Sequence, residues 1–541
     1  MSEDELSQAQ LTNGKNNLSL SFLYASYTLT KELKSLKTDS FETNLLLKNL
    51  SLRNQQRIKT SILNSGDTVL TSQYEQFISN KKQIQKMQES ATTVAPEALE
   101  KITNETEVLE KELVRKSALF AESKNAMSVS FDQIKNKLKP NEVVIDLVAF
   151  DYYNKKWTDS IVYGAFVVKK EYDAPKFIPL FEQKQLEFLL HKNKNQADST
   201  RINTQYTNKA ISDLFLQPLE YELKGCTSVY LSPAGLGHQV NFKALPLSDN
   251  ETFGGKYKIH LLGSTAELVT YKDSRIQKNT EIIAFGAIDY NKRDTNQKEE
   301  DLLPTVITDP VIVSNQRGVN DNFGYLTGTK TEIKQIETQT KQLGFTTALF
   351  SDRYATEESI KKLDGKKTPF VLHLATHGFF FEDPKRELND GFSENNTSKF
   401  FKESDNPMMR SGLLFAGANK YWGKTTAKPT SDDGILTASE ISNLDLGACE
   451  LVVLSACETG LGEIKGSEGV FGLQRAFKMA GVKNIIMSLW KVPDTQTAEL
   501  FGVFYGEYLS GKSIHEAFQL AQAAMKAKYE PYYWAGFVLL E

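Results

Sequence analysis

Two short apolar segments of this chain each end at a reactive side chain. Residues 370–375 are followed by Thr376, His377 and Gly378, and residues 451–455 are followed by Ala456 and Cys457. Both runs are rich in Val and Leu, which is typical of interior strands of a parallel sheet. Because the carboxyl ends of parallel strands meet at one edge of a sheet, we expect His377 and Cys457 to face each other there.

An imidazole beside a thiol produces a thiolate nucleophile, so this pair predicts a cysteine peptidase. Cys457 follows His377 by 80 residues, which leaves room for a helical crossover between neighbouring parallel strands. The caspase signature has Gly two residues after Cys and its His about 50 residues upstream. Here Glu458 and Thr459 separate Cys457 from Gly460, and the His lies farther away, so a conventional caspase is a poor match.

Several longer strings carry a family resemblance. They are HLATHGFF (373–380), DGILTASEI (433–441), LVVLSACETGLG (451–462), GSEGVFGLQRAFKMAG (466–481), SLWKVPD (488–494) and WAGFVLL (534–540), with weaker matches at YLSPAGLGHQVNFKALP (230–246) and ATEESIKKL (355–363). Over roughly residues 130–541 the chain resembles the CHAT family, which comprises caspase-like cysteine peptidases related to separase and often attached to tetratricopeptide repeats.

The resemblance implies an α/β fold, a caspase-like parallel-sheet sandwich with a catalytic half and a pseudo-caspase half that lacks catalytic residues. We expect an all-α helical region at 1–130, the pseudo-caspase subdomain at 131–275 and the catalytic subdomain at 276–541. Apolar residues at three- and four-residue steps near 41–64, 69–90 and 97–125 predict the helices of the first region. A repeat of about 34 residues is not visible, so a tetratricopeptide array is not supported.

From about residue 140 onward, strand and helix patterns alternate, which indicates a parallel α/β sheet. Val-, Ile-, Tyr- and Phe-rich segments predict strands at 142–150, 161–168, 228–232, 281–286, 346–350 and 484–489. The polar insert 383–433 is expected to be a mobile loop close to the active edge.

Composition narrows the function classes. The formal net charge is -4, so no global field favours nucleic acid or an anionic membrane, and no apolar run approaches the ~20 residues of a membrane span. Acidic residues near the amino terminus argue against a secretory signal. Three scattered cysteines, Cys226, Cys449 and Cys457, fit neither a disulfide framework nor a zinc site. We therefore expect a cytoplasmic enzyme without a metal or other cofactor.

Each catalytic assignment has a structural alternative. A lone Cys is most often a small buried hydrophobe, but Cys457 follows its strand, whereas Cys226 and Cys449 keep the structural interpretation. His377 is the expected general base, and His373, four residues earlier, raises the alternative of a zinc pair on one helix face. The segment reads as a strand, so His373 is better explained as a packed residue that could orient the dyad.

Gly378 and the backbone N–H of Cys457 are the expected oxyanion-hole donors. Gly378 could equally serve only to end its strand.

Substrate-binding candidates follow the same strands. In separase-like relatives, an Asp in a Trp-x-Val-x-Asp string holds a basic residue before the cut, and Asp494 matches it, which implies Arg or Lys at P1. Asp494 is equally a good helix N-cap. Trp490 is a subsite wall or a packing residue. Asp433 and Glu458 are further substrate candidates, with a solvated loop charge and a surface turn as the alternatives.

The sequence thus predicts a cysteine endopeptidase that cleaves protein substrates after a basic residue. An activating protein partner is expected to act through the helical amino-terminal region, with no direct nucleic-acid or membrane binding. The alternatives are a catalytically silent scaffold with the same fold, and another Cys-dependent hydrolase.

Overall fold

The computed structural model describes residues 3–26, 33–89, 96–120, 129–278, 280–291, 323–383, 401, 404, 406–422, 433–457, 459–465 and 468–541. Among them no helix is long and apolar enough to cross a membrane.

The amino-terminal region consists of helices, as predicted. They are α1 (Glu3–Ala25), α2 (Lys34–Leu47), α3 (Leu50–Asn64), α4 (Thr68–Glu89) and α5 (Pro96–Phe120). The predicted helix near 41–64 is interrupted at Asn49, whose φ of 55° is left-handed and cannot continue a helix. α1 was not predicted, because its serines and asparagines weaken the apolar period.

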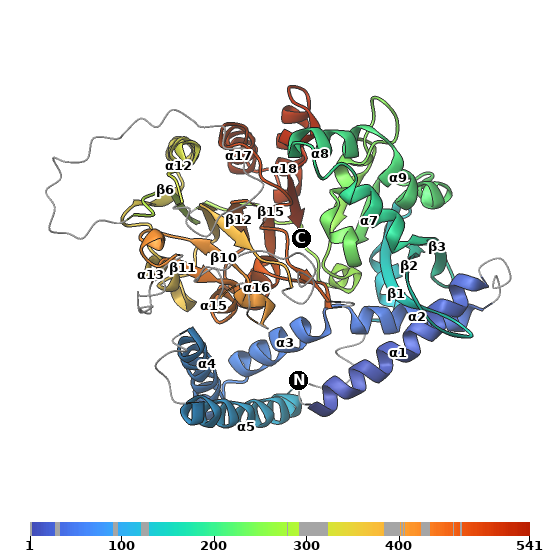
Figure 1. Ribbon diagram of the computed structural model, residues 1–541, viewed down its shortest axis with the longest axis horizontal. Coiled ribbons are helices and arrows are strands. Elements are labelled where there is room, and N and C mark those ends of the chain that lie inside the picture. Colours follow the sequence, from blue (N-terminus) through green and yellow to red (C-terminus); the bar gives the residue numbers. More distant parts are fainter. Residues whose placement is uncertain are drawn as a thin grey trace, which may run out of the picture.

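One sheet of eleven strands, in the order β3-β2-β1-β4-β5-β16-β15-β12-β8-β6-β7, forms the centre of the protein (Figure 1). The first half contains β1 (Glu142–Asn154), β2 (Lys156–Lys169), β3 (Lys176–Glu182), β4 (Ser228–Ser232) and β5 (Lys258–Leu261). The second half contains β6 (Glu281–Ile288), β7 (Thr346–Asp352), β8 (Val371–Ala375), β12 (Leu451–Ser455), β15 (Asn484–Ser488) and β16 (Phe537–Leu540). The expected parallel-dominated α/β fold with a helical amino-terminal region is therefore confirmed.

The two halves join edge to edge in this sheet. β16 pairs in parallel with β5, where Leu540 faces Leu261, and antiparallel with β15. The parallel strands of the first half therefore run opposite to those of the second half.

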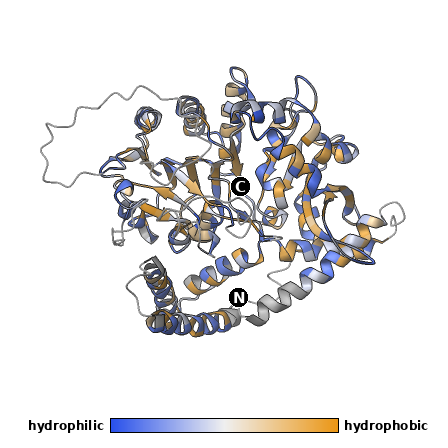
Figure 2. Cartoon of the chain, in the orientation of Figure 1, coloured by the Kyte–Doolittle hydropathy of each residue, from blue (hydrophilic) through white to orange (hydrophobic). Residues whose placement is uncertain are grey.

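Helices cover both faces of the second half. α12 (Thr327–Leu343), α17 (Asp494–Leu509) and α18 (Ile514–Lys526) lie above the strands in Figure 1, and α15 (Ala438–Ser442) and α16 (Leu473–Ala480) lie below them. Further helices are α6 (Phe131–Lys137), α7 (Gln183–His191), α8 (Asp198–Thr207), α9 (Ala210–Phe215), α10 (Glu220–Leu223), α11 (Phe253–Lys256), α13 (Glu357–Lys361) and α19 (Pro531–Trp534). Every residue of β8, β12 and β15 is buried, as expected for strands covered on both faces, and these strands are hydrophobic in Figure 2.

Two small sheets flank the second half. One has the order β11 (Ile435–Thr437), β10 (Ser411–Leu414), β9 (Gly378–Phe380), and the other pairs β13 (Glu463–Ile464) with β14 (Val470–Phe471). Much of the insert 383–433, expected to be a mobile loop, lies outside the described residues. Its described part corrects that expectation in one respect, because it contains β10, which is fully buried.

The helices α2 and α3 hold both halves of the sheet. Lys48 Nζ lies 2.9 Å from Asp146 Oδ1 in β1, and both side chains are buried. In α3 the N–H of Ser51 donates to Glu468 Oε1 at 3.1 Å, and Glu468 also pairs with Arg475 of α16 at 3.0 Å. Figure 1 shows α1, α2 and α3 running along one side of the molecule past both halves.

Candidate active site

The register of β8 and β12 sets the positions of the two reactive residues. Ala375 faces Ser455 in parallel pairing, and the N–H of Thr376 donates to the carbonyl of Ser455 at 3.2 Å. His377 and Cys457 each follow this paired position by two residues. The structure therefore brings both to the same carboxyl rim of the sheet.

The turn that carries Cys457 is held by the end of β15. The Ser488 hydroxyl donates to the carbonyl of Ala456, the Ser488 N–H donates to Thr459 Oγ1 at 3.0 Å, and the Gly460 N–H donates to the Ser488 carbonyl at 2.7 Å. Three neighbouring strand ends thus fix the backbone around the thiol.

The imidazole of His377 is fixed by its neighbours. Its Nε2 lies 2.9 Å from the carbonyl oxygen of Gly324, and its ring contacts those of Tyr290 and Phe323, with centroids 5.0 and 5.2 Å away. A carbonyl only accepts hydrogen bonds, so Nε2 carries the proton, and in neutral His377 the lone pair is on Nδ1. Nδ1 is therefore the atom that can accept a proton from a thiol.

Gly378 lies directly against the backbone of the Cys457 turn. A Cβ built on Gly378 would lie 2.9 Å from the carbonyl oxygen of Cys457. Only glycine lets the segments that leave β8 and β12 approach this closely. This contact keeps Gly378, one of the two expected oxyanion donors, beside Cys457.

Tyr290 connects the groups of the rim. Its hydroxyl accepts from the His377 N–H at 3.3 Å and lies 3.0 Å from Thr376 Oγ1. Burial raises the pKa of Tyr290, and the negative charges of Asp494 and Cys457 raise it further. Burial raises the pKa of Tyr532 to about 12, and the negative charges of Asp198 and Cys457 add to the rise.

A buried polar network lies beneath the reactive pair. His373 Nε2 lies 2.9 Å from Glu332 Oε1, its Nδ1 lies 3.2 Å from the hydroxyl of Tyr505, and Glu332 Oε2 accepts from Ser455 at 3.1 Å. His373 is thus the packed strand residue that we expected. The zinc alternative required His373 and His377 on one helix face, and this segment is the strand β8.

Asp494 is the first residue of α17, and Pro493 precedes it in the capping position without a side-chain cap. Asp494 packs against Gly328 at the start of α12, since a Cβ on Gly328 would lie 2.3 Å from the Asp494 Cβ. Its effect on the Tyr290 pKa puts its charge near the rim that carries the dyad. The N-cap alternative is therefore not what the structure has, although an acidic first turn still favours the helix dipole.

The other substrate candidates differ in their surroundings. Trp490 is buried, its Nε1–H donates to the carbonyl of Tyr532 at 2.9 Å, and its ring lies 5.5 Å from that of Tyr206. These contacts favour the packing alternative. Glu458 lies outside the described residues.

Asp433 is not a solvated loop charge. Burial raises its pKa to about 7, with the charge of Glu440 adding to the rise, and Lys361 lies 2.9 Å from Glu440 and also pairs with Glu357. The group joins α13, β11 and α15, which gives Asp433 a structural environment.

Within the described part of the chain, one cluster brings together three side chains of types that can ligate a metal. Glu541 Oε2 lies 2.9 Å from His260 Nδ1 and 3.0 Å from His515 Nδ1, and Tyr271 donates to Glu541 Oε1 at 2.8 Å. Burial lowers the pKa of His515 to about 3, so this imidazole is neutral. Three protein donors satisfy the carboxylate without an ion, and the cluster joins β5, α18 and the end of β16.

Sequence reasoning missed the groups that fix His377. The Gly324 carbonyl is a backbone group with no residue signature, and Tyr290 and Phe323 lie far from the motifs in sequence. The pairing of Ser488 with Thr459 had a signal, because both residues fall in the strings that carry the family resemblance.

The fold and the residues at the rim of the sheet define the class of protein. It is an α/β protein with an imidazole and a thiol just after the ends of two adjacent strands. The CHAT domain model matches residues 205–541, and the chain belongs to the CHAT domain family.

Among curated proteins, tetratricopeptide repeat protein 28 of Mus musculus is 34% identical over 110 residues, 20% of this chain and 4% of the relative. The Homo sapiens protein of the same name is 33% identical over 116 residues, 21% of this chain and 5% of the relative. The matched stretch thus spans about a twentieth of these relatives.

Two solved structures show distant likeness. The Arg specific cysteine proteinase gingipain R has 12% identity and a TM-score of 0.32, with 65% of this chain and 73% of that chain covered. The Saccharomyces cerevisiae separase-securin complex has 11% identity and a TM-score of 0.32, with 87% of this chain and 27% of that chain covered.

Proposed function

We propose that the protein is a cysteine endopeptidase that uses Cys457 as nucleophile and His377 as general base. The observation that supports this most directly is the register of β8 and β12, which gives the imidazole and the thiol equivalent positions on adjacent strand ends. The hydrogen bond from Nε2 of His377 to the carbonyl of Gly324 gives further support, because it leaves Nδ1 as the proton acceptor.

The proposed reaction has two halves. Nδ1 of His377 takes the thiol proton, and the sulfur attacks the peptide carbonyl to form a tetrahedral intermediate, whose oxyanion the N–H groups of Gly378 and Cys457 stabilise. The protonated imidazole then gives its proton to the leaving amine, which leaves a thioester. Water, deprotonated by the same imidazole, hydrolyses the thioester and restores the thiol.

The nucleophile is tested with Cys457→Ala, which should abolish cleavage and leave the folded structure intact. Iodoacetamide near neutral pH should alkylate wild-type Cys457 rapidly. The other thiols give little background, because burial raises the pKa of Cys449 to about 12 and also raises that of Cys226. Cys226→Ala is the matched control and should keep full activity. Cleavage by the Cys457→Ala variant would refute the assignment.

The proposed substrates are proteins cut after Arg or Lys, with the carboxylate of Asp494 facing the P1 cation. Loss of a charged hydrogen bond of this kind costs about 1.5–3 kcal/mol, which is roughly a tenfold to hundredfold loss. Asp494→Asn should therefore lower kcat/KM for basic P1 peptides by about that factor and spare neutral ones. Glu507→Gln, at the other end of α17, is the control. A peptide library cut after acidic or apolar residues would contradict this specificity.

An activating protein partner is proposed to act through the helical region, in a reducing cytoplasm where the thiol survives. The support is that α3 reaches the catalytic half directly: Gln56 donates to the carbonyl of Lys478 at 2.6 Å, and Lys59 pairs with Asp445 at 2.8 Å. A partner that shifts α3 would therefore move α16 and the loop after Cys457.

A further inference from the structure

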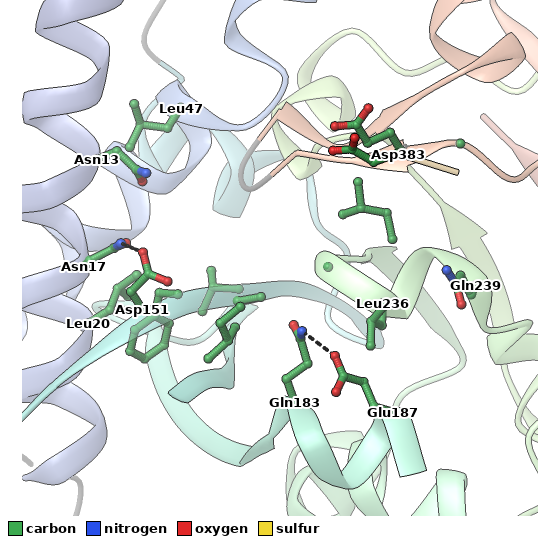
Figure 3. A pocket seen from close by; sticks show the side chains of 18 of the residues that line it. Asn13, Asn17, Leu20, Leu47, Asp151, Gln183, Glu187, Leu236, Gln239 and Asp383 are labelled. Carbon is green, nitrogen blue, oxygen red and sulfur yellow. Dashed lines mark hydrogen bonds between the residues drawn. The ribbon is translucent and has the colours of Figure 1, made fainter. Parts of the chain in front are cut away.

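A cavity of about 380 Å³ lies where α1, the first half of the sheet and the catalytic half meet (Figure 3). Two groups of residues form its wall on the side of the catalytic half: Phe380, the last residue of β9, with Glu382 and Asp383, and residues Gly462, Glu463 and Ile464. The first group follows His377 and the second follows Cys457, so both segments that leave the proposed dyad line the cavity. Its volume is within the range of ligand sites, about 300–1,000 Å³.

The cavity begins close to the rim of the sheet. β9 starts at Gly378 and ends at Phe380, and a strand rises about 3.3 Å per residue, so Phe380 is roughly 10 Å along the strand from His377. An extended peptide has the same rise. A substrate residue a few positions away from the cleaved bond therefore reaches the cavity.

The walls carry an excess of negative charge. The acidic side chains that line the cavity are Asp151, Glu187, Glu382, Asp383 and Glu463, against one lysine, Lys194. Burial, together with Lys194, lowers the pKa of His191, which therefore adds no positive charge at neutral pH.

Among the residues that the structure describes, ion pairs balance the charge of Glu463. Glu463 pairs with Arg410 and lies 3.5 Å from Lys465. Glu187 instead accepts from the amide of Gln183 at 2.9 Å, and Asp151 accepts from the amide of Asn17 at 3.4 Å; Figure 3 shows both contacts. Amides carry no charge, so these two hydrogen bonds do not neutralise the carboxylates of Glu187 and Asp151.

A second feature of the wall also calls for a hydrogen-bond donor. Asn16 lines the cavity and is 6% exposed, and its Oδ1 has no hydrogen-bond partner among the residues that the structure describes. A buried acceptor without a partner costs free energy unless a ligand or water donates to it. Carboxylates and amide oxygens together match a ligand that is positively charged and only donates, and among side chains at neutral pH this means Lys and Arg.

We propose that this cavity is a subsite that binds Lys or Arg side chains of a protein substrate several residues away from the bond that is cut. The proposal rests on the proposed peptidase function and adds a second basic determinant, separate from the P1 residue at Asp494. A substrate must then carry a basic cluster, rather than a single basic residue, to be held at the dyad.

The test measures binding to the full chain with Cys457→Ala, which requires no turnover and so does not depend on the peptidase assignment. Two fluorescent peptides share one P1 residue and differ only in an Arg–Arg pair or a Gln–Gln pair several positions away. Fluorescence anisotropy should show the Arg–Arg peptide binding about tenfold or more tightly, and Glu187→Gln with Glu382→Gln should remove that difference. Added salt should weaken the Arg–Arg peptide selectively.

Glu220→Gln with Glu251→Gln is the matched control, because it removes two exposed carboxylates that do not line the cavity, and it should leave the difference unchanged. Equal affinities of the two peptides, or a preference that survives the cavity variant, would overturn the proposal. Displacement of the Arg–Arg peptide by equimolar spermidine would assign the site to a small polyamine and would overturn it as well.

Discussion

Backbone groups set much of the chemistry at the rim. His377 is oriented by a carbonyl oxygen, and the turn of Cys457 is in contact with a glycine that has no Cβ. The hydroxyl of Tyr290 accepts from the backbone N–H of His377. The reactive side chains can therefore be recognised in the sequence, whereas the groups that aim them cannot.

Gly378→Ala should lower kcat/KM by about a hundredfold or more, because the new Cβ would lie 2.9 Å from the Cys457 carbonyl and displace an oxyanion donor. Peptide turnover measures this loss, and circular dichroism should show an intact fold. Gly506→Ala, a helical site with nothing nearer than 3.6 Å to the added Cβ, should keep wild-type turnover. A wild-type turnover rate in the Gly378 variant would show that the close contact between Gly378 and the Cys457 carbonyl is not needed for activity.

The sequence predicted the positions of His377 and Cys457 because both follow short runs of buried Val and Leu. It could not predict Gly324 as the acceptor for Nε2, since any residue type supplies a carbonyl oxygen. The family string predicts a substrate role for Asp494, which stays a prediction. For Trp490 it left a subsite wall and a packing role open, and the structure has the ring packed near Tyr206.

α12 is joined to β8 and β12 by one buried carboxylate, that of Glu332. Glu332→Ala removes the partner of His373 and Ser455 and leaves a polar cavity. Loss of the buried hydrogen bond from Ser455 and of the contact with His373 should lower the free energy of unfolding by about 1–3 kcal/mol. Urea denaturation measures this, and Glu337→Ala, which loses an exposed pair with Lys341, should cost below about 0.5 kcal/mol. Similar losses for both variants would show that the network is not stabilising.

The group around Asp433 predicts a pH dependence of stability. Its pKa of about 7 in the folded protein, against an ordinary 3.8, means that the folded state binds the proton more tightly. The contribution of Asp433 to the free energy of unfolding is therefore largest below about pH 4. It is lost as the pH rises from there through about 7, by up to about 4 kcal/mol. Asp433→Asn should remove that fall, so its melting temperature should exceed that of the wild type at pH 8 more than at pH 5. Asp159→Asn, which changes an exposed carboxylate, should not alter the pH dependence of the melting temperature. An unchanged pH profile in the Asp433 variant would refute the raised pKa of Asp433.

The main strands of the large sheet were predictable because each is a short run rich in apolar and β-branched residues. β12 and β4 begin and end as expected, and β6, β7 and β8 differ from the prediction only at their ends. β10 was missed, because a strand of four residues inside a polar insert gives no usable period and is buried only through its pairing with β9 and β11.

The helical region is connected to the sheet by the ion pair between Asp146 and Lys48, the residue that follows α2. Lys48→Ala would leave a fully buried carboxylate uncompensated and should lower the free energy of unfolding by about 3–5 kcal/mol, as measured by urea denaturation. Lys34→Ala, which removes a largely exposed pair with Asp173, should cost at most about 1 kcal/mol. If Lys48→Ala were as stable as the wild type, the helical region would not be anchored by this pair.

The helical character of the chain before residue 130 and the change to strands after residue 140 were visible in the sequence, because periodicity is local, whereas the number of helices was not. The joining of both halves into one sheet was not, since the pairing of Leu540 with Leu261 links residues that no local pattern relates.

β16 is the strand of the large sheet that comes latest along the chain, yet it lies in the middle of that sheet, between β5 and β15. A ribosome delivers His377 and Cys457 well before it delivers Phe537–Leu540, so a nascent polypeptide contains both reactive residues while its two halves are still unjoined. The two halves can therefore join into one sheet only after Phe537–Leu540 has been synthesised.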